Sequence, residues 1–464
     1  MQQKSELPEG WETSDLGSLI SIASGKYIKR EDYSKIPDQP YPVAGAGGPI
    51  GYTDSYNFTS PIITLGRVGA AGALTVYKKN AWVTDNTLVI KPNSQDLFNW
   101  LIRYFQTVDW ISIQTGSSQP LITQKIVKAL TIPLPPLAEQ HRIVTAIEAL
   151  FARLDAAQAR LDRVPGILQQ FRQAVLAAAC DGRLTEDWRA EHPNIENSRK
   201  YLEITLNTLS SGKKKIQTPD TSGLNDIPDK WCWATIEQLA SPEARSIQSG
   251  PFGSNLLHSE FQDSGILAIG IDNVQNGFFS YGKEHRISPE KYEELRKYTA
   301  RPLDLLITVM ATIGRCCVFP ENCETAIITK HVYRITSNQD LVSPHYLFQT
   351  LRGAIPVQQQ IQNQIRGQTR PGINGTILKS IAIPLPPIPE QDEIVHRADA
   401  LFALADQIEA RVATAKERTE TLRQSILTQA FSGQLVPTEA ELAQRERREY
   451  EPALVLLERI KSSI

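Results

Sequence analysis

One stretch of the chain occurs twice, and this repeat constrains the fold more than any other feature. When the 464-residue sequence is compared with itself at an offset of 251, residues 122–185 match residues 373–436 without a gap, with about 25 of 64 positions identical. Chance does not produce such an ungapped match, so the repeat is a duplicated structural unit. Its clearest phrase is IPLPPLAEQ at 132–140, which returns as IPLPPIPEQ at 383–391.

A shorter repeat opens each half of the chain. LPEGWETSDLGSLI begins at Leu7 and IPDKWCWATIEQLA begins at Ile227, so Trp11 corresponds to Trp231 at an offset of 220. The region between the opening motif and the long repeat is therefore about 31 residues longer in the second half. Each half consists of a tryptophan start, a variable region and the repeated unit, which indicates a common scaffold that carries two different inserts.

Apolar residues in the repeat recur at alternating steps of four and three, which is the heptad seam of a coiled coil. The seam runs for about 34 residues, or roughly 50 Å of helix. A helix of that length needs a partner, so we expect the two copies to pack as an antiparallel pair; the alternative is that each helix packs on its own domain. The coiled-coil positions are Ile143, Ile147, Leu150, Leu154, Leu161, Leu168, Ile394, Leu401, Ile408, Val412, Leu422 and Ile426.

Prolines, acidic residues and glycines mark the ends of these helices. The PLPP run ends the preceding strand, because proline cannot continue a ladder of hydrogen bonds. Pro389 suits the first helical turn, where its missing N–H costs nothing. Glu139 and Glu390 lie in the same turn and favour the positive end of the helix dipole. Gly182 and Gly433 follow the last apolar positions and suit C-terminal caps.

Pro165 lies inside the first heptad seam, where a mid-helix proline costs about 3 kcal/mol. Lys416 holds the corresponding position in the second copy. We therefore expect the first helix to be kinked or broken near Pro165 and the second helix to be straighter.

Composition and charge restrict the class of protein. No apolar run is long enough for a membrane span, and the N-terminus has no apolar core of a signal peptide, so we expect a cytoplasmic location. The net charge of −2 argues weakly against a nucleic-acid binder, although an acidic surface elsewhere can hide a basic groove. The cysteines form no C-x-x-C pair and fit buried thiols in a reducing compartment. A zinc site from Cys316, Cys317 and Cys323 would have the wrong spacing for a finger-type site.

Motifs for catalysis are absent from the sequence. We find no N-P-P-Y-like loop of an amino-methyltransferase, no H-E-x-x-H and no G-x-S-x-G. SSGKKK at 210–215 lacks the upstream glycine of a phosphate-binding loop and reads as part of a linker. YPVAGAGGPIGY at 41–52 has no strand-turn-helix frame and reads as a loop. The chain therefore reads as a binding protein without a catalytic centre.

Both variable regions contain short β-branched runs between glycine-rich turns, so we expect a shared β-rich core with different loops. Arg can form two hydrogen bonds with guanine, and Gln can form two with adenine, so such side chains on loops are candidate DNA contacts. A surface residue of this kind is, however, more often simply solvated. The segments TGSSQP and RGQTRP are the stronger candidates, because they are polar, matched and tethered to the scaffold. The candidates are Lys26, Lys29, Arg30, Arg67, Lys78, Lys79, Ser117, Ser118 and Gln119 in the first region and Arg315, Lys330, His331, Arg366, Gln368, Thr369 and Arg370 in the second.

The double IPLPPxxEQ, the heptad helix after each copy, RQAVL with RQSIL, and the LPEGW-type opening resemble the specificity subunits of type I restriction-modification systems. The resemblance covers nearly the whole chain. It implies an α+β fold in which two β-rich target-recognition domains are separated by two long helices, which form an antiparallel coiled coil with pseudo-twofold symmetry. The implied domains are 1–121 and 227–372 (target recognition), 122–185 and 373–436 (spacer helices), 186–226 (linker) and 437–464 (C-terminal helical tail).

The resemblance also implies a function. Each target-recognition domain would read one half of a split, asymmetric site in double-stranded DNA. The chain would dock two adenine-methyltransferase (modification) subunits and, through them, restriction subunits that translocate and cut DNA. S-adenosylmethionine, ATP and magnesium are expected on those partners, with no cofactor, metal, catalytic residue or membrane contact in this chain. Two alternatives stay open: a single-chain restriction or methylation enzyme with a fused recognition module, and a helical scaffold that never touches DNA.

Overall fold

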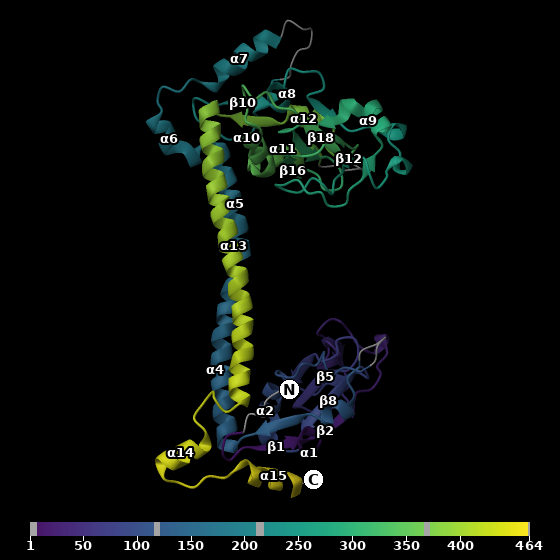
Figure 1. Cartoon of the computed structure of the whole chain (residues 1–464), viewed down its shortest axis with the longest axis vertical. Coiled ribbons are helices and arrows are strands. Elements are labelled where there is room, and N and C mark those ends of the chain that lie inside the picture. Colours follow the sequence, from purple (N-terminus) through teal and green to yellow (C-terminus); the bar gives the residue numbers. More distant parts are fainter. Residues whose placement is uncertain (1–6, 116–120, 210–217, 366–371, 463–464) are drawn as a thin grey trace. The chain divides into compact units, whose positions relative to one another are not determined.

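The computed structural model describes residues 7–115, 121–209, 218–365 and 372–462 (Figure 1). The chain forms two compact units, one of residues 1–162 with 412–464 and one of residues 163–411. Each unit therefore combines a β-rich domain with helical segments from both repeats. Among the described residues, no helix is both long enough and apolar enough to cross a membrane.

The β-rich domain of the first unit contains two sheets. The first sheet is antiparallel, with the order β2-β8-β5-β6 and the bounds Ile20–Ser24, Thr87–Pro92, Ile62–Gly66 and Leu74–Tyr77. The second has the order β4-β3-β7, with the bounds Gly48–Thr53, Tyr41–Gly45 and Trp82–Val83, and its β3 and β7 are parallel. The prediction that residues 41–52 form a loop is wrong, because most of them belong to the antiparallel pair β3–β4. The short helices are α1 (Leu16–Leu19), η1 (Arg30–Asp32), η2 (Gln95–Leu97), α2 (Phe98–Phe105) and α3 (Gln124–Lys128).

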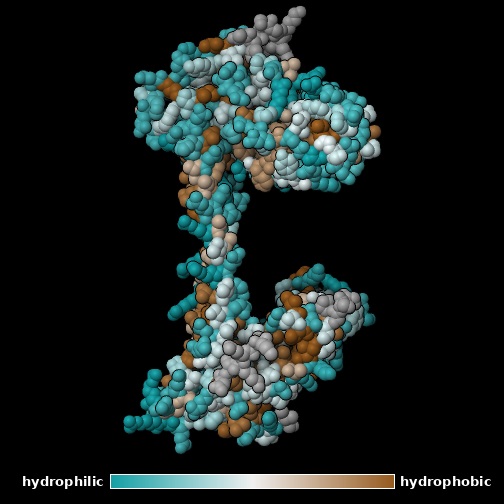
Figure 2. Space-filling model, viewed as in Figure 1, coloured by the Kyte–Doolittle hydropathy of each residue, from teal (hydrophilic) through white to brown (hydrophobic). Residues whose placement is uncertain are grey.

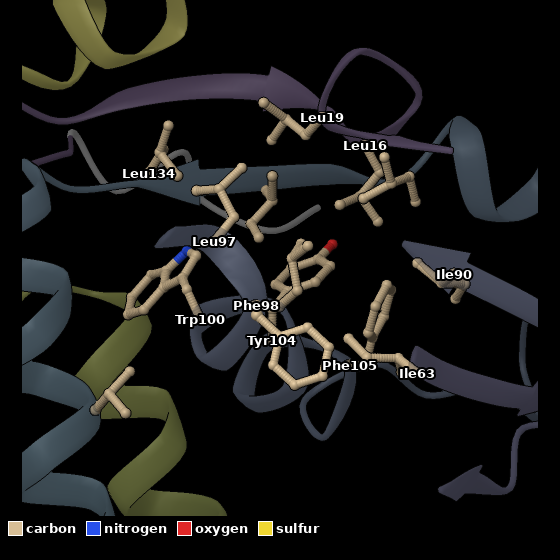
Figure 3. Packing of buried hydrophobic residues seen from close by; sticks show 14 of the residues in the cluster. Leu16, Leu19, Ile63, Ile90, Leu97, Phe98, Trp100, Tyr104, Phe105 and Leu134 are labelled. Atoms are coloured by element: carbon tan, nitrogen blue, oxygen red, sulfur yellow. The ribbon is translucent and has the colours of Figure 1, made fainter. Parts of the chain in front are cut away.

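The core of this unit lies between the first sheet and α2. The apolar positions Phe98, Leu101 and Phe105 recur at helical spacing, so one face of α2 is apolar. This face belongs to the same buried cluster as Ile63 of β5 and Ile90 of β8 (Figure 3). The sheet and the helix thus bury their apolar faces against each other, which is what makes the domain stable.

The β-rich domain of the second unit repeats this topology. Its first sheet has the order β11-β18-β15-β16, with the bounds Ile247–Ser249, Val332–Ile335, Leu305–Thr308 and Cys316–Val318. Its second sheet has the order β13-β12-β17-β14, with the bounds Arg286–Ile287, Ile266–Ile269, Ala326–Ile328 and Thr299–Ala300, and β12 and β17 are parallel. The predicted β-rich core shared by the two variable regions is confirmed, with β14 as an addition. The helices are α8 (Ile236–Leu239), η4 (Gly253–Asn255), η5 (His258–Glu260), α9 (Pro289–Leu295), η6 (Arg296–Tyr298), α10 (Pro344–Gly353), α11 (Ile355–Ile365) and α12 (Gly375–Ser380).

Cys316 and Cys317 are neighbours on β16, where successive side chains point to opposite faces of the sheet. Cys316 accordingly belongs to one buried cluster and Cys317 to another. Burial raises the pKa of both thiols to about 12. Both are thus buried structural thiols, and their opposite orientations argue against a shared zinc ion.

The PLPP motif is used in the same way in both units. In the first unit, β1 (Glu12–Asp15) after the opening tryptophan pairs antiparallel with β9 (Thr131–Leu134). In the second unit, β10 (Cys232–Thr235) pairs in the same register with β19 (Ala382–Leu385). Each ribbon has only two strands, so a proline in it leaves no inner ladder incomplete.

The Glu-Gln pair after each PLPP motif fixes the opening motif to the helix. The indole N–H of Trp11 donates to Glu139 and that of Trp231 donates to Glu390, each over 2.9 Å. The side-chain amides of Gln140 and Gln391 donate to the carbonyls of the prolines five residues earlier, over 2.8 and 2.9 Å. The two copies of IPLPPxxEQ therefore build the same joint between a domain and its helix.

A further correspondence is hidden in the short helices before each repeat. The Trp100 indole of α2 donates to the carbonyl of Pro133 over 3.1 Å, and the Tyr346 hydroxyl of α10 donates to the carbonyl of Pro384 over 2.8 Å. The two prolines are 251 residues apart, so α2 and α10 occupy the same place in their units. The residue types differ, which is why sequence comparison misses the match.

The long helices are α4 (Leu137–Leu161), α5 (Val164–Asp181) and α13 (Ile388–Phe431). In the first unit, α4 lies beside the C-terminal part of α13 (Figure 1), and Arg423 and Lys416 form ion pairs with Asp155 and Asp162. Because the residue numbers fall on one helix as they rise on the other, the two helices are antiparallel.

The second unit contains the matching helix pair. There α5 lies beside the N-terminal part of α13, with Arg172 bonded to Asp406 over 2.6 Å (Figure 1). Arg172 and Asp406 stand 251 residues from Arg423 and Asp155, so the same ion pair forms in both units. The expected antiparallel pairing of the two copies is confirmed within each unit.

The break near Pro165 is confirmed. The first helix ends at Leu161, and α5 begins at Val164 with Pro165 in its first turn, where a proline is tolerated. The second copy, which has Lys416 at this position, is the uninterrupted α13 of 44 residues. The caps are also confirmed, since Gly182 and Gly433 follow their helices with φ of +83° and +74°.

The prediction that Leu422 belongs to the seam is wrong. Its side chain is 47% exposed, whereas Leu427 is buried. Arg423 takes the inward position and lies over the ring of Phe151. After Thr419 the inward positions are therefore Arg423, Ile426 and Leu427, and the guanidinium of Arg423 packs on an aromatic ring of α4.

The C-terminal tail corresponds to the segment that follows the first repeat. After α5 the chain forms η3 (Arg183–Thr185), α6 (Glu186–Glu191) and α7 (Ser198–Leu209), and after α13 it forms α14 (Glu439–Glu446) and α15 (Ala453–Ser462). The amide of Ser198 donates to the carbonyl of Lys230, and that of Ala453 donates to the carbonyl of Gly10. Lys230 and Gly10 both precede the opening tryptophan, so the duplication extends beyond the stretch that sequence similarity reveals.

Candidate nucleic-acid interface

Loops of the same kind meet at one edge of each β-rich domain. We call these sets the loop edges; they comprise Gly25–Arg30, Arg67–Gly72 and Thr84–Asn86 in the first domain and Gly250–Asn255, Val309–Gly314 and Thr329–His331 in the second. The loops follow β2, β5 and β7, or β11, β15 and β17, which are the corresponding strands of the two domains. Their equivalence rests on matching backbone contacts.

A glycine begins each loop edge. The amide of Gly25 donates to the carbonyl of Thr87, and the amide of Gly250 donates to that of Val332. A Cβ atom on Gly25 would collide with the backbone of Thr84, and one on Gly250 would collide with that of Thr329. Only glycine lets the chain cross the neighbouring turn this closely. We call Gly25 and Gly250 the crossing glycines.

The hairpin loops share their turn geometry. Gly69 and Ala311 are the third residues after the strand-ending Gly66 and Thr308, and both have positive φ, +77° and +60°. The loops close with the same hydrogen bonds, from Gly72 to Gly66 and from Gly314 to Thr308 over 2.8 and 2.9 Å. The hairpins thus have equivalent backbones with different side chains.

The first residues of the long repeats are tied to these hairpins. Ile122 donates its amide to the carbonyl of Arg67 over 3.0 Å, and Ile373 donates to that of Val309 over 3.1 Å. The Gln124 side chain also donates to the Ser24 hydroxyl beside the crossing glycine, over 3.2 Å. The predicted contacts within TGSSQP and RGQTRP, namely Ser117, Ser118, Gln119, Arg366, Gln368, Thr369 and Arg370, lie outside the described residues.

The structure brings most of the other candidate residues to the loop edges. The first edge carries Lys26, Lys29, Arg30 and Arg67, and the second carries Lys330 and His331, with Arg315 directly after its hairpin loop. Lys78 and Lys79 are not among them. They follow Tyr77, which pairs with Ile62 at the end of the β5–β6 hairpin opposite to the loop. A hairpin has two ends, and sequence alone did not distinguish them.

The polar groups at the edges are only partly engaged. Lys29 lies 3.5 Å from Glu31 in an exposed ion pair, which contributes little to stability. Arg67 Nε and His331 Nδ1 are buried atoms without a hydrogen-bond partner among the described residues. Burial and the neighbouring Lys330 lower the pKa of His331, so its imidazole is neutral at physiological pH and offers one donor and one acceptor. The ammonium group of Lys29 is accessible to an anionic ligand, whereas the two buried nitrogen atoms are covered by protein.

Sequence reasoning missed the correspondence between the edges because the offset changes along the chain. It is 225 at the crossing glycines, 242 at the hairpins and 251 at the long repeats. The shared signal is a Ser-Gly pair, Ser24-Gly25 and Ser249-Gly250, which is too short to be found without the structure.

The family described as the type I restriction modification DNA specificity domain matches residues 8–165 and 267–415. The EcoDI specificity subunit of a type I restriction enzyme from Escherichia coli is 29% identical over 437 residues, covering 93% of this chain and 90% of that protein. The MjaVIII specificity subunit from Methanocaldococcus jannaschii is 22% identical over 454 residues, covering 92% and 94%.

Solved structures share the fold. A chain from a type I restriction-modification system, described for its complex assembly and conformational transition, matches with a TM-score of 0.62 at 18% identity, over 93% of this chain and 100% of that chain. The HsdS subunit from Thermoanaerobacter tengcongensis matches with a TM-score of 0.53 at 19% identity, over 94% and 100%. The predicted α+β architecture of two β-rich domains with long helices is confirmed. The curated relatives named above are specificity subunits, in agreement with the prediction of a subunit that is not itself an enzyme.

Proposed function

Because this chain belongs to the family of type I restriction modification DNA specificity domains, we propose that its two β-rich domains read the two halves of a split, asymmetric DNA site. The loop edges are the reading surfaces. In the assembled system the chain docks two modification subunits and, through them, restriction subunits, and it acts with them in the cytoplasm. S-adenosylmethionine, ATP and magnesium bind to those partner subunits.

One observation carries this proposal: the two loop edges have the same backbone anchors and different side chains. Arg67 of the first edge is replaced by Val309 in the second, and Asn86 is replaced by His331. Base edges in the major groove are distinguished by the donors and acceptors that face them. Two equivalent frames with unlike side chains would therefore read unlike base sequences, so the site would be asymmetric.

The long helices support the docking of partners. Ile167 on α5 and Leu404 and Leu422 on α13 are large apolar side chains that are exposed to solvent. A protein partner that covers these side chains would gain the free energy of removing them from water. We propose that modification subunits bind along these helices and that the helices set the gap between the half-sites.

Domain exchange tests the reading role. The first domain, residues 11–118, is replaced by the corresponding domain of another specificity subunit, and methylated adenines are mapped across the genome of cells that carry the complete system. One half of the methylated site is expected to change and the other half to stay the same. A change in both halves, or in neither, would contradict the assignment of one domain to each half-site.

Helix insertion tests the spacing role. Two heptads inserted at matched positions in α4 and α13 add about 21 Å to each helix. The gap between the half-sites is expected to lengthen, as read from the same methylation map. An unchanged gap would reject the spacing role, and turnover of DNA by the pure chain with magnesium and S-adenosylmethionine would reject the assignment of catalysis to the partners.

A further inference from the structure

An exposed aromatic residue stands at the same place in both loop edges. It is the second residue after the crossing glycine, Tyr27 in the first domain and Phe252 in the second, and its side chain is 71% and 55% exposed. Large aromatic side chains are usually buried, because exposing them forfeits their transfer free energy. Figure 2 shows scattered hydrophobic surface on both β-rich domains among mostly hydrophilic residues. Two exposed aromatics at one structural position indicate a common ligand.

The residue before each aromatic is held firmly, by different means. The amide of Lys26 donates to the carbonyl of Val83 over 2.9 Å, and its carbonyl accepts a hydrogen bond from the Trp82 indole over 3.2 Å. Pro251 at the same place is buried, and its ring fixes φ. The aromatic side chains are therefore presented on prepared backbones, which lowers the entropy lost when a ligand binds.

Space and charge beside the aromatics favour a nucleic acid as the ligand. Gly253 follows Phe252 with a φ of +65°, and a Cβ atom there would meet nothing within 4 Å, so a ligand can approach closely. Lys26 and Lys29 flank Tyr27, and Lys330 follows the turn that the second crossing glycine touches. Cationic side chains next to an exposed ring are the combination that stacks a base and holds its phosphate.

We propose that Tyr27 and Phe252 each stack on a base, one in each half-site, at a step that is partly unstacked when the complex binds the duplex, and that they supply affinity that does not depend on the base sequence. This rests on the proposed function and assigns the part of it that is common to both domains. Every base has a π-face, so a Tyr and a Phe perform this role equally well although the surrounding side chains differ. Sequence choice is then left to the polar residues of each loop edge.

Binding measurements on variants test the stacking role. Tyr27→Ala and Phe252→Ala are prepared in the full chain, co-purified with its modification subunits, and tested on a duplex that carries the methylated site. Each is expected to weaken binding roughly 5- to 100-fold, whereas Tyr27→Phe keeps wild-type affinity. The slope of log Kd against log salt is expected to stay the same, because no cation is lost. Tyr201→Ala is the matched control, since this tyrosine is 48% exposed on α7, away from the loop edge.

Photocrosslinking provides a direct readout. The same duplex with thymines replaced by 5-iodouracil is irradiated, and crosslinks to peptides that contain Tyr27 or Phe252 are expected from stacked thymine positions. Wild-type affinity in both alanine variants would overturn the proposal while leaving the proposed function intact. Loss of modification subunits from the variants would also overturn it, because the rings would then be protein contacts. Failure of the wild-type complex to prefer its site would instead reject the proposed function.

Discussion

At the scale of single residues, the crossing glycines have the most restrictive role. Gly25 and Gly250 pass so close to a neighbouring turn that any side chain would meet backbone atoms, which cannot rotate away. Gly166 on α5 is different, since a Cβ atom there would meet nothing within 4 Å. Glycines in one chain thus differ in whether their lack of a side chain is needed.

Alanine substitutions at these glycines should have opposite effects. Gly25→Ala is expected to lower the free energy of unfolding of its unit by about 2 kcal/mol, because the clash displaces the loop or the turn. Gly166→Ala is expected to raise it by roughly 0.5–1 kcal/mol, because alanine restricts the unfolded chain and favours helix. Thermal unfolding of the two variants measures both changes. Equal effects would contradict the proposed close crossing.

A buried carboxyl group gives a second prediction at this scale. Glu139 accepts hydrogen bonds from the Trp11 indole and from the amide of Glu439, over 2.9 and 2.7 Å. Burial raises the pKa of Glu139 above its usual 4.5, because a charge is poorly solvated inside the protein, although these hydrogen bonds act in the opposite direction. A raised pKa means that the folded state binds the proton more tightly than the unfolded state.

The stability that Glu139 contributes should therefore depend on pH. The contribution is fully present below about pH 4.5 and is lost as the pH rises through the raised pKa of the folded state. Glu139→Gln does not titrate. The free energy of unfolding of the wild type, minus that of the variant, is expected to be larger at pH 5 than at pH 7.5. Urea denaturation at both values tests this, and a difference that grows with pH would reverse the sign.

At the scale of elements, the two copies of the long repeat differ in helix continuity: the first is broken near Pro165 and the second is continuous. The chain ends α4 and restarts as α5, which moves Pro165 from a helix interior to a first turn. In α13, Lys416 continues the helix and pairs with Asp162 over 2.6 Å. The ion pair thus joins the uninterrupted helix to the residue that directly follows α4.

Substitutions at these two positions should differ in their effect on stability. Lys416→Pro is expected to cost about 3 kcal/mol, since proline in the interior of α13 removes a hydrogen bond and clashes with the preceding turn. Pro165→Ala, the matched control, is expected to change stability by less than about 1 kcal/mol, because its position already tolerates many residues. Circular dichroism at 222 nm during thermal unfolding measures both. A large loss for Pro165→Ala would mean that the break depends on proline.

At the scale of the whole molecule, the two units are built from the same parts taken from different places in the chain. The tail after α13 packs in the first unit beside its opening motif, and the segment after α5 takes the same place in the second unit. Leu456, Leu457 and Ile460 of α15 belong to the buried cluster of the first β-rich domain. The C-terminal tail is therefore part of the core of the domain at the other end of the sequence.

Removal of residues 437–464 should affect one unit only. The first unit loses several buried leucine and isoleucine side chains, each worth about 2–5 kcal/mol, so it is expected to melt earlier or not to fold. The second unit contains none of these residues and should melt as in the full chain. Differential scanning calorimetry resolves the two transitions. Leu454→Ala, at an exposed position of α15, is the control and should leave both unchanged.

The predictability of this protein from its sequence follows the strength of each local signal. The long helices, their caps and the break at Pro165 were predictable, because heptad spacing and proline act over short distances. The loop edges were not, because insertions shift the offset between their crossing glycines and their hairpins. Trp100 and Tyr346 make the same hydrogen bond with different chemistry, and the tail matches the segment after α5 without similar residues. Such equivalences exist only in three dimensions.

The changing offset between the two domains has a wider consequence. The second domain accommodates about 17 more residues than the first between its crossing glycine and its hairpin, yet every backbone anchor remains in place. The additional residues are thus accommodated while the corresponding backbone hydrogen bonds are kept. Lineages of such molecules are free to lengthen, shorten or borrow loops and to acquire new preferences in a single step, while the architecture that presents them is inherited unchanged.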